Sequence, residues 1–129
     1  AGEQAAMICG MAEDPSIEYM QNGAVGFSSG MANFVPGLSL ELWRQVKAAN
    51  LDEAQRLRDL MVPFEDFRGE NAARYSGSAL HAAMDIAGLA GGPVIPFAED
   101  VADADLGRVQ AMMAQLLAEE NILKERKSI

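Results

Sequence analysis

The fold is decided by residues 25–36, "VGFSSGMANFVP". This stretch begins as a short apolar strand and ends in two small hydroxyl side chains, Ser28 and Ser29. A second apolar run, residues 5–9 ("AAMIC"), is closed by Gly10. Short continuous apolar runs of this kind are typical of strands buried on both faces, as in a parallel sheet. We therefore expect two buried strands, the second of which ends at the serine pair.

A helix is predicted between the two apolar runs. Asp14 suits the N-cap, Pro15 suits the first helical position, and Gly23 suits the C-terminal stop. Strand, helix and strand then follow one another within about 25 residues, which is the pattern of a βαβ unit. The strands over residues 5–9 and 24–29 should consequently be parallel.

The rest of the chain is predicted to be helical, apart from residues 91–101. Apolar residues recur at helical spacing after Pro36, after the N-cap candidate Asp52 and after the N-cap candidate Asp103, and we expect Pro63 to bend or end the second of these helices. The apolar positions are Leu42, Trp43, Val46 and Ala49; Ala54, Leu57, Leu60, Met61 and Phe64; and Leu106, Val109, Met113, Leu116 and Leu117.

A further helix is expected within residues 74–92, where Gly91 and Gly92 would stop it. The segment that follows should be extended, because Pro93 and Pro96 exclude a helix.

The chain has the size and composition of one globular domain. It has 129 residues, half of them apolar, and a net charge of −9, which argues against nucleic acid and anionic membranes as partners. Cys9 is the single cysteine, so no internal disulfide forms and a reducing, cytoplasmic location is expected. No apolar run approaches the ~18 residues of a membrane span.

Several chemically active side chains are given structural interpretations. His81 has no second His or Cys at ligand spacing, so no metal site is expected. Cys9 is interpreted as a buried apolar filler. Glu119, Glu120 and the acids of residues 99–105 are interpreted as solvated surface charge.

A sheet of two parallel strands poses a physical difficulty, because each strand keeps an unpaired edge. Parallel sheets normally have more strands and are covered on both faces. A βαβ unit followed by a long helical segment is therefore predicted to be the end of a larger α/β domain.

Residues 8–36, "ICGMAEDPSIEYMQNGAVGFSSGMANFVP", resemble the last two βα units of the dihydrodipicolinate synthase / N-acetylneuraminate lyase family of (β/α)8 TIM barrels. The family pattern has a strand ending in glycine, a helix, a "G-A-x-G-x-x-S" strand and an asparagine. The matching positions are Gly10, Gly23, Gly26, Ser29 and Asn33.

The resemblance continues through residues 53–64, "EAQRLRDLMVPF", and residues 91–97, "GGPVIPF". Within the family, "FSSGMANFVP" is closest to dehydratase-like members such as 5-dehydro-4-deoxyglucarate dehydratase. Ile95 departs from the family pattern, which usually has an arginine there.

The resemblance implies an α/β chain that forms the C-terminal portion of a TIM barrel of about 250 residues. Residues 1–36 would be the last two βα units, and residues 37–129 the final barrel helix and a C-terminal helical extension. The family's reactive lysine, which forms a Schiff base with a keto carbon, would lie on an earlier strand. The lysines of this chain, Lys47, Lys124 and Lys127, are helix or tail residues, so no catalytic residue is assigned here.

Substrate contacts are expected at the carboxyl ends of the two strands. Residues alternate along a strand, so Ser28 would face the barrel interior and Ser29 the helices, unless the strand breaks there. The resemblance places Glu13 at a position that contacts substrate hydroxyls in lyase members. The predicted substrate-binding residues are Gly10, Glu13, Ser28, Ser29, Gly30 and Asn33.

Each of these residues also has a purely structural interpretation. Serines at a strand end often form turns, Gly10 and Gly30 suit tight turns, and Asn33 is expected to tie its loop by side-chain-to-backbone bonds.

The sequence thus favours part of a Schiff-base lyase that cleaves, condenses or dehydrates a pyruvate-like 2-keto acid. The resemblance implies no cofactor or metal, a small keto-acid substrate, and a homo-oligomer, usually a tetramer. The alternative is a non-catalytic helical module for assembly or interaction.

Overall fold

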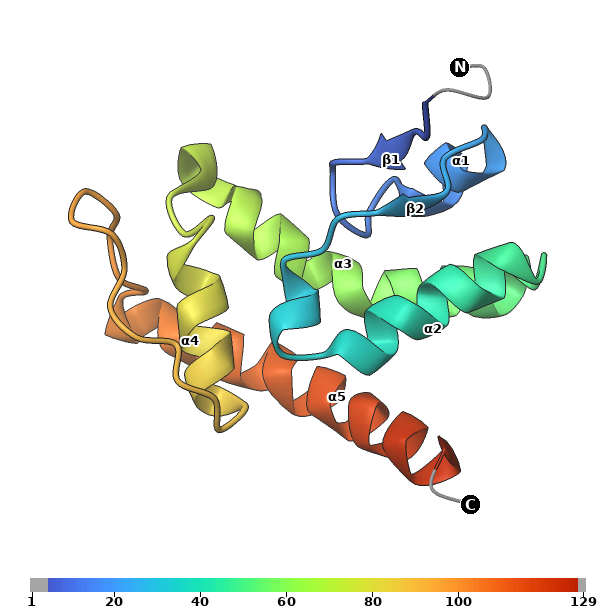
Figure 1. Cartoon of the computed structure of the whole chain (residues 1–129). Helices are drawn as coiled ribbons and strands as arrows, with labels where there is room; N and C mark the ends of the chain where they lie inside the picture. Colours follow the sequence, from blue (N-terminus) through green and yellow to red (C-terminus); the bar gives the residue numbers. More distant parts are fainter. Residues whose placement is uncertain (1–4, 128–129) are drawn as a thin grey trace.

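The computed structural model describes residues 5–127, with side chains placed as far as Arg126. A small βαβ unit lies against a set of longer helices (Figure 1). The elements are β1 (Ile8–Cys9), α1 (Ser16–Gln21), β2 (Gly26–Phe27), η1 (Met31–Asn33), α2 (Pro36–Lys47), α3 (Leu51–Ala73), α4 (Ser78–Ile86) and α5 (Asp103–Lys127).

The predicted parallel pairing of the two strands is confirmed. Ile8 pairs with Gly26 and Cys9 with Phe27, and α1 connects the strands. The strands are shorter than expected, and the prediction that the first is buried on both faces is wrong for Ile8, whose exposed fraction is 61%. Cys9 is fully buried, as expected of a filler residue. Ile8 is exposed because its side chain lies on a face of the two-stranded sheet that the described residues leave largely uncovered.

The start of α1 differs from the prediction. Asp14 does not cap the helix, since Pro15 occupies the N-cap position and no side chain bonds there. The Asp14 carboxylate instead accepts a hydrogen bond of 2.8 Å from Arg58 of α3. The stop at Gly23 is confirmed by its φ of +100°, which a residue with a side chain rarely adopts.

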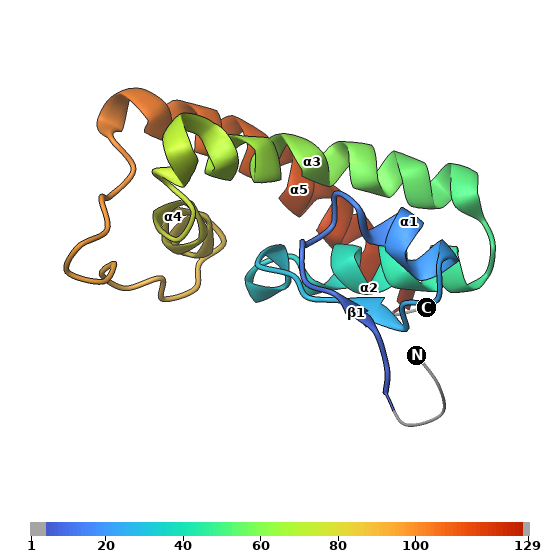
Figure 2. The same ribbon diagram turned by 90° about the horizontal axis from the view of Figure 1, so that it is seen from above.

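The core lies among α2, α3 and α5, with α4 near one end of α3 and the βαβ unit near the other (Figure 2). The apolar stripes predicted for these helices supply much of it. Its fully buried members include Leu38, Leu42, Ala54, Leu57, Met61, Phe64, Val109 and Met113. Burying one such large apolar side chain is worth about 1.5–3 kcal/mol, so this helical cluster holds most of the packing energy.

The predicted start of α3 is wrong, because Asn50, and not Asp52, is at the N-cap. Pro63 was expected to bend or end the helix, and it does not end it, since the helix continues to Ala73. Met61 and Phe64 on either side of the proline are both fully buried, so their packing outweighs the missing backbone hydrogen bond. The helical geometry breaks later, at Glu70–Ala72, where Asn71 and Ala72 have positive φ angles.

The two later helices also begin and end differently from the prediction. The helix α4 ends at Ile86, before Gly88 with its φ of +78°, rather than at Gly91. Asp103 is the first residue of α5 and not its cap. No helix of the described residues is long and apolar enough to cross a membrane.

Glu120 contradicts its interpretation as solvated surface charge. Its side chain is 1% exposed, and its two carboxylate oxygens accept hydrogen bonds from the backbone N–H groups of Gly37 (3.0 Å) and Leu38 (2.8 Å). These are among the first N–H groups of α2, which have no partner within their own helix. A carboxylate from α5 therefore caps α2 and neutralises the positive end of its dipole.

Candidate functional site

An open pocket of about 560 Å³ lies at the carboxyl ends of the two strands. Three segments line it: the loop after β1, the segment after β2, and the last turns of α3 with the turn that follows. The lining residues are Gly10, Met11, Ala12, Ser28, Ser29, Gly30, Glu65, Arg68, Gly69, Ala73 and Ser76. Four of the six predicted substrate-binding residues, Gly10, Ser28, Ser29 and Gly30, are therefore brought together.

The serine pair marks the point where β2 leaves the sheet. Ser28 is exposed in the pocket, and its backbone N–H still donates to Cys9 O at 2.8 Å. Ser29 lies beyond this last ladder bond and is half-buried. Its hydroxyl accepts a hydrogen bond of 2.9 Å from the backbone N–H of Ala32, at the start of η1. The strand thus ends at the serines, and both line the pocket.

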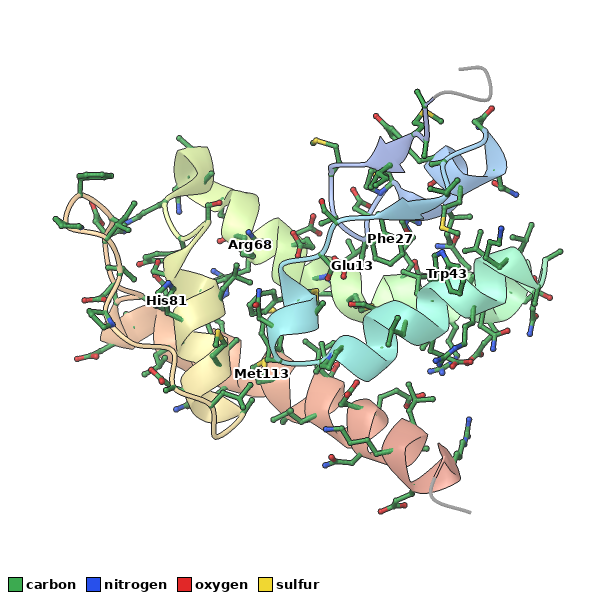
Figure 3. All side chains as sticks on the ribbon, in the orientation of Figure 1. Glu13, Phe27, Trp43, Arg68, His81 and Met113 are labelled. Carbon is green, nitrogen blue, oxygen red and sulfur yellow. The ribbon has the colours of Figure 1, made fainter. Side chains whose placement is uncertain are left out.

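Glu13 lies behind Ser29, where the βαβ unit meets the helices (Figure 3). Its side chain is fully buried and is not among the pocket's lining residues. Its Oε1 is hydrogen-bonded to the hydroxyl of Ser29 and accepts a hydrogen bond of 2.9 Å from Ser39 of α2. The two hydroxyl oxygens of Ser29 and Ser39 are themselves 3.1 Å apart.

The other carboxyl oxygen of Glu13, Oε2, is buried and has no hydrogen-bond partner among the described residues. Burial raises the pKa of the Glu13 carboxyl, and the nearby negative charge of Glu65 raises it further. The hydrogen bonds from Ser29 and Ser39 act in the opposite direction but do not reverse the shift in pKa. Glu13 therefore holds its proton to higher pH than an exposed glutamate.

The wall opposite the serines carries an ion pair that the sequence analysis did not identify. Arg68 Nη1 donates to both carboxylate oxygens of Glu65, at 2.8 and 3.0 Å, and Arg68 Nε donates to Ser76 O at 2.8 Å. Arg68 also approaches the strand end, since a Cβ on Gly30 would lie 3.0 Å from Arg68 Nη1. The spacing of Glu65 and Arg68 predicts a helical pair, but nothing local indicates that α3 passes over the strand ends.

The remaining predicted residues have plain structural surroundings. Asn33 ties its loop as expected, with its side-chain amide donating to Gly30 O at 2.8 Å. Gly10 has open space where a side chain would stand. His81 is hydrogen-bonded to Gly92 O at 3.0 Å, and the described residues contain no cluster of potential metal ligands.

Comparison with known proteins identifies the family. Residues 1–115 match the Dihydrodipicolinate synthetase family. The chain belongs to that family. The resemblance inferred from residues 8–36 is therefore confirmed.

Curated relatives of this dihydrodipicolinate synthetase family chain are named "Probable 5-dehydro-4-deoxyglucarate dehydratase". The protein of Saccharopolyspora erythraea is 35% identical over 107 residues, which cover 82% of this chain and 33% of the relative. The protein of Ralstonia nicotianae is 30% identical over 118 residues, which cover 89% of this chain and 38% of the relative. The expected similarity to dehydratase members is thus confirmed.

Solved structures of dihydrodipicolinate synthases have a similar fold. The enzyme of Oceanobacillus iheyensis superposes with a TM-score of 0.76 at 27% identity, and that of Bacillus clausii with a TM-score of 0.77 at 26% identity. These neighbours are TIM barrels, and the match covers 91% and 90% of this chain but 38% of each of them. The chain therefore spans about two fifths of the length of these two enzymes, and about a third or slightly more of the two curated relatives.

Proposed function

We propose that this chain is the C-terminal part of a Schiff-base-forming lyase that dehydrates a 2-keto acid. The observation that carries the proposal is the pocket at the strand ends, where Ser28, Ser29 and Arg68 converge. Ligands of barrel enzymes bind at this end of the strands. The names of the curated relatives favour dehydration over aldol cleavage or condensation, and 5-dehydro-4-deoxyglucarate is the proposed substrate.

The residues of the pocket suit a keto acid with a carboxylate at each end and hydroxyls between. The Ser28 hydroxyl and the backbone around Gly10 and Gly30 are placed to bind polar oxygens of the substrate. Arg68 supplies positive charge, and Glu65 beside it supplies acceptors for hydroxyl groups. Glu13 is proposed to act on the substrate through Ser29, to which its carboxyl group is hydrogen-bonded.

The two strands and α1 would close the barrel, and the later helices would form its last helix and its extension. None of the pocket's described lining residues is a lysine, and Lys47 lies on α2, so the Schiff-base lysine is proposed to lie on a strand outside this chain. The intact enzyme is proposed to be a cytoplasmic homo-oligomer that needs no cofactor.

Borohydride trapping tests this proposal. The polypeptide as its gene encodes it would be incubated with pyruvate, reduced with borohydride and weighed by mass spectrometry. A Schiff-base enzyme gains the mass of pyruvic acid less one oxygen atom, on one lysine that peptide mapping locates. Trapping with pyruvate reports Schiff-base formation alone. Turnover of 5-dehydro-4-deoxyglucarate is therefore measured separately, without borohydride, by product analysis.

Absence of any adduct on the intact polypeptide would overturn the proposal and would favour a helical assembly module. An adduct on a lysine of this chain would also contradict it, because the reactive amine is placed elsewhere.

A further inference from the structure

The hydrogen bonds around Ser29 depend on where the proton of Glu13 lies. Ser29 Oγ has one proton to donate and two lone pairs that accept. One lone pair accepts from the Ala32 N–H. If Glu13 is ionised, the Ser29 proton is committed to Glu13 Oε1, and Ser29 offers the pocket only an acceptor.

Protonation of Glu13 reverses this arrangement. With the proton on Oε1, Glu13 donates to Ser29 and still accepts from Ser39, whose hydroxyl is 2.9 Å away. Both lone pairs of Ser29 are then occupied, so its own proton is released from Glu13 and has two acceptors to choose from: the Ser39 hydroxyl 3.1 Å away, or a substrate oxygen in the pocket that Ser29 lines. Protonation of Glu13 also accounts for its unpartnered Oε2, because burying a neutral carbonyl oxygen without a hydrogen-bond partner costs less free energy than burying a charged oxygen.

We propose that protonated Glu13 makes Ser29 the proton donor to the hydroxyl group that the substrate loses. This inference rests on the proposed function, and it assigns to Ser29 the contact with the leaving group and to Glu13 a positioning role behind it. Glu13 is not exposed in the pocket, so it reaches the substrate only through Ser29.

In the enamine formed from the keto carbon and the lysine amine, the nitrogen lone pair re-forms the C=N bond and the enamine electron pair forms a C=C bond between the α and β carbons as the C–O bond at the β carbon breaks. The departing oxygen takes the proton of Ser29 and leaves as water. Ser29 takes the proton of Glu13, and the resulting carboxylate is reprotonated from the pocket through Ser29 before the next turnover.

Charged groups near Glu13 come from two elements. Glu65 of α3 raises the pKa of Glu13 and is itself paired with Arg68. Asp14, the next residue of the loop, is paired with Arg58 of α3. The α2 side contributes the uncharged Ser39. No cation is hydrogen-bonded to Glu13 among the described residues, so nothing there favours the ionised form by direct contact.

The test uses Glu13→Gln in the full polypeptide, since glutamine keeps the volume and can donate to Ser29 but has no acid proton to transfer. Pyruvate trapping measures Schiff-base formation, and turnover of 5-dehydro-4-deoxyglucarate measures dehydration. We expect trapping to match the wild type, KM to change little, and kcat to fall by about 10²-fold or more, the range for loss of a general acid. Ser29→Ala should give a similar loss of kcat.

The pH profile separates proton supply from a structural role. Wild-type kcat should fall as pH rises through the raised pKa of Glu13, and the residual activity of Glu13→Gln should lack this fall. Glu41→Gln is the matched control, because Glu41 pairs with Arg44 and Gln45 away from the pocket and should leave both trapping and the pH profile unchanged.

Three outcomes overturn the inference: a Glu13→Gln kcat close to that of the wild type, a lost kcat with the wild-type pH profile, or loss of trapping together with kcat. Absence of trapping in the wild type is a different result, which refutes the proposed function itself.

Discussion

Gly37 is a position where one added carbon should have a clear effect on the structure. A Cβ at Gly37 would lie 2.6 Å from Glu120 Oε2 and 2.8 Å from Oε1, closer than non-bonded atoms approach. Gly37 lies in the first turn of α2, where an alanine would otherwise be favourable. The substitution Gly37→Ala should therefore displace the carboxylate that caps α2.

The magnitude follows from the two hydrogen bonds at stake. Each bond from a backbone N–H to a charged acceptor is worth about 1.5–3 kcal/mol, and Glu120 accepts one from Gly37 and one from Leu38. If displacement of the carboxylate costs about 3 kcal/mol and the helix propensity of alanine returns up to ~1 kcal/mol, the net loss of stability is about 2 kcal/mol. Glu120→Ala should cost about 3 kcal/mol, because both bonds are lost.

A double-mutant cycle isolates the contact between the two residues. Once Glu120 is alanine, the Cβ at position 37 has nothing to displace, so Gly37→Ala should cost nothing further. The coupling energy should be about 2–3 kcal/mol, at the upper end of values for residues in contact. Urea unfolding of the four full-length polypeptides, followed by circular dichroism, measures each free energy of unfolding.

Gly107→Ala is the matched control, because Gly107 lies inside α5 and a Cβ added there would have open space around it. It should stabilise by up to ~1 kcal/mol. The predicted clash between the Gly37 position and Glu120 is ruled out if Gly37→Ala stabilises to the same extent as Gly107→Ala, or if the effects of Gly37→Ala and Glu120→Ala simply add.

Three further predictions concern stability. The raised pKa of Glu13 means that the folded state binds the Glu13 proton more tightly than the unfolded state does. The free energy of unfolding should therefore fall as pH rises from 4.5 through the raised pKa. Glu13→Gln should show a smaller fall in the urea midpoint across this range. Trp43→Phe removes the 3.0 Å hydrogen bond from Trp43 Nε1 to Val25 O and should cost about 1 kcal/mol, and an unchanged free energy of unfolding would speak against that bond. Ala72→Gly should stabilise by about 1 kcal/mol in thermal unfolding because Ala72 has a φ of +59°, and a loss of stability would argue against the left-handed turn.

The βαβ unit and the helical core could be predicted because their signals are local. Gly23 ends α1 where its backbone needs a positive φ, and the spacing of Leu57, Met61 and Phe64 places them on one buried face. Neither inference required knowledge of distant parts of the chain. The errors at Asp14 and Asp52 concern single N-cap positions. The Asp14 carboxylate bonds Arg58 in place of the start of α1, and Asn50 takes the N-cap position expected for Asp52.

The site was only half predictable because its other half depends on contacts between distant residues. Glu120 and Gly37 are 83 positions apart, and in a run of acidic and polar residues nothing distinguishes a capping carboxylate from a solvated one. Arg68 belongs to an ordinary helical ion pair until α3 is seen to pass over the strand ends. Ser29 was expected to face the helices unless the strand broke; its hydroxyl does lie beside Ser39 of α2, and because the ladder ends at Ser28 N, Ser29 also lines the pocket.

The helices after the sheet are connected to the pocket by a series of hydrogen bonds joined at one point by the backbone between Leu38 and Ser39. Glu120 of α5 holds the backbone of Leu38, and the next residue, Ser39, donates to Glu13, which is bonded to Ser29 at the pocket. A shift of the first turn of α2 would therefore move the Ser39 hydroxyl relative to Glu13. The C-terminal helices are thus part of what fixes the geometry of the serines, because the group that orients Ser29 is itself held by a helix whose start depends on α5.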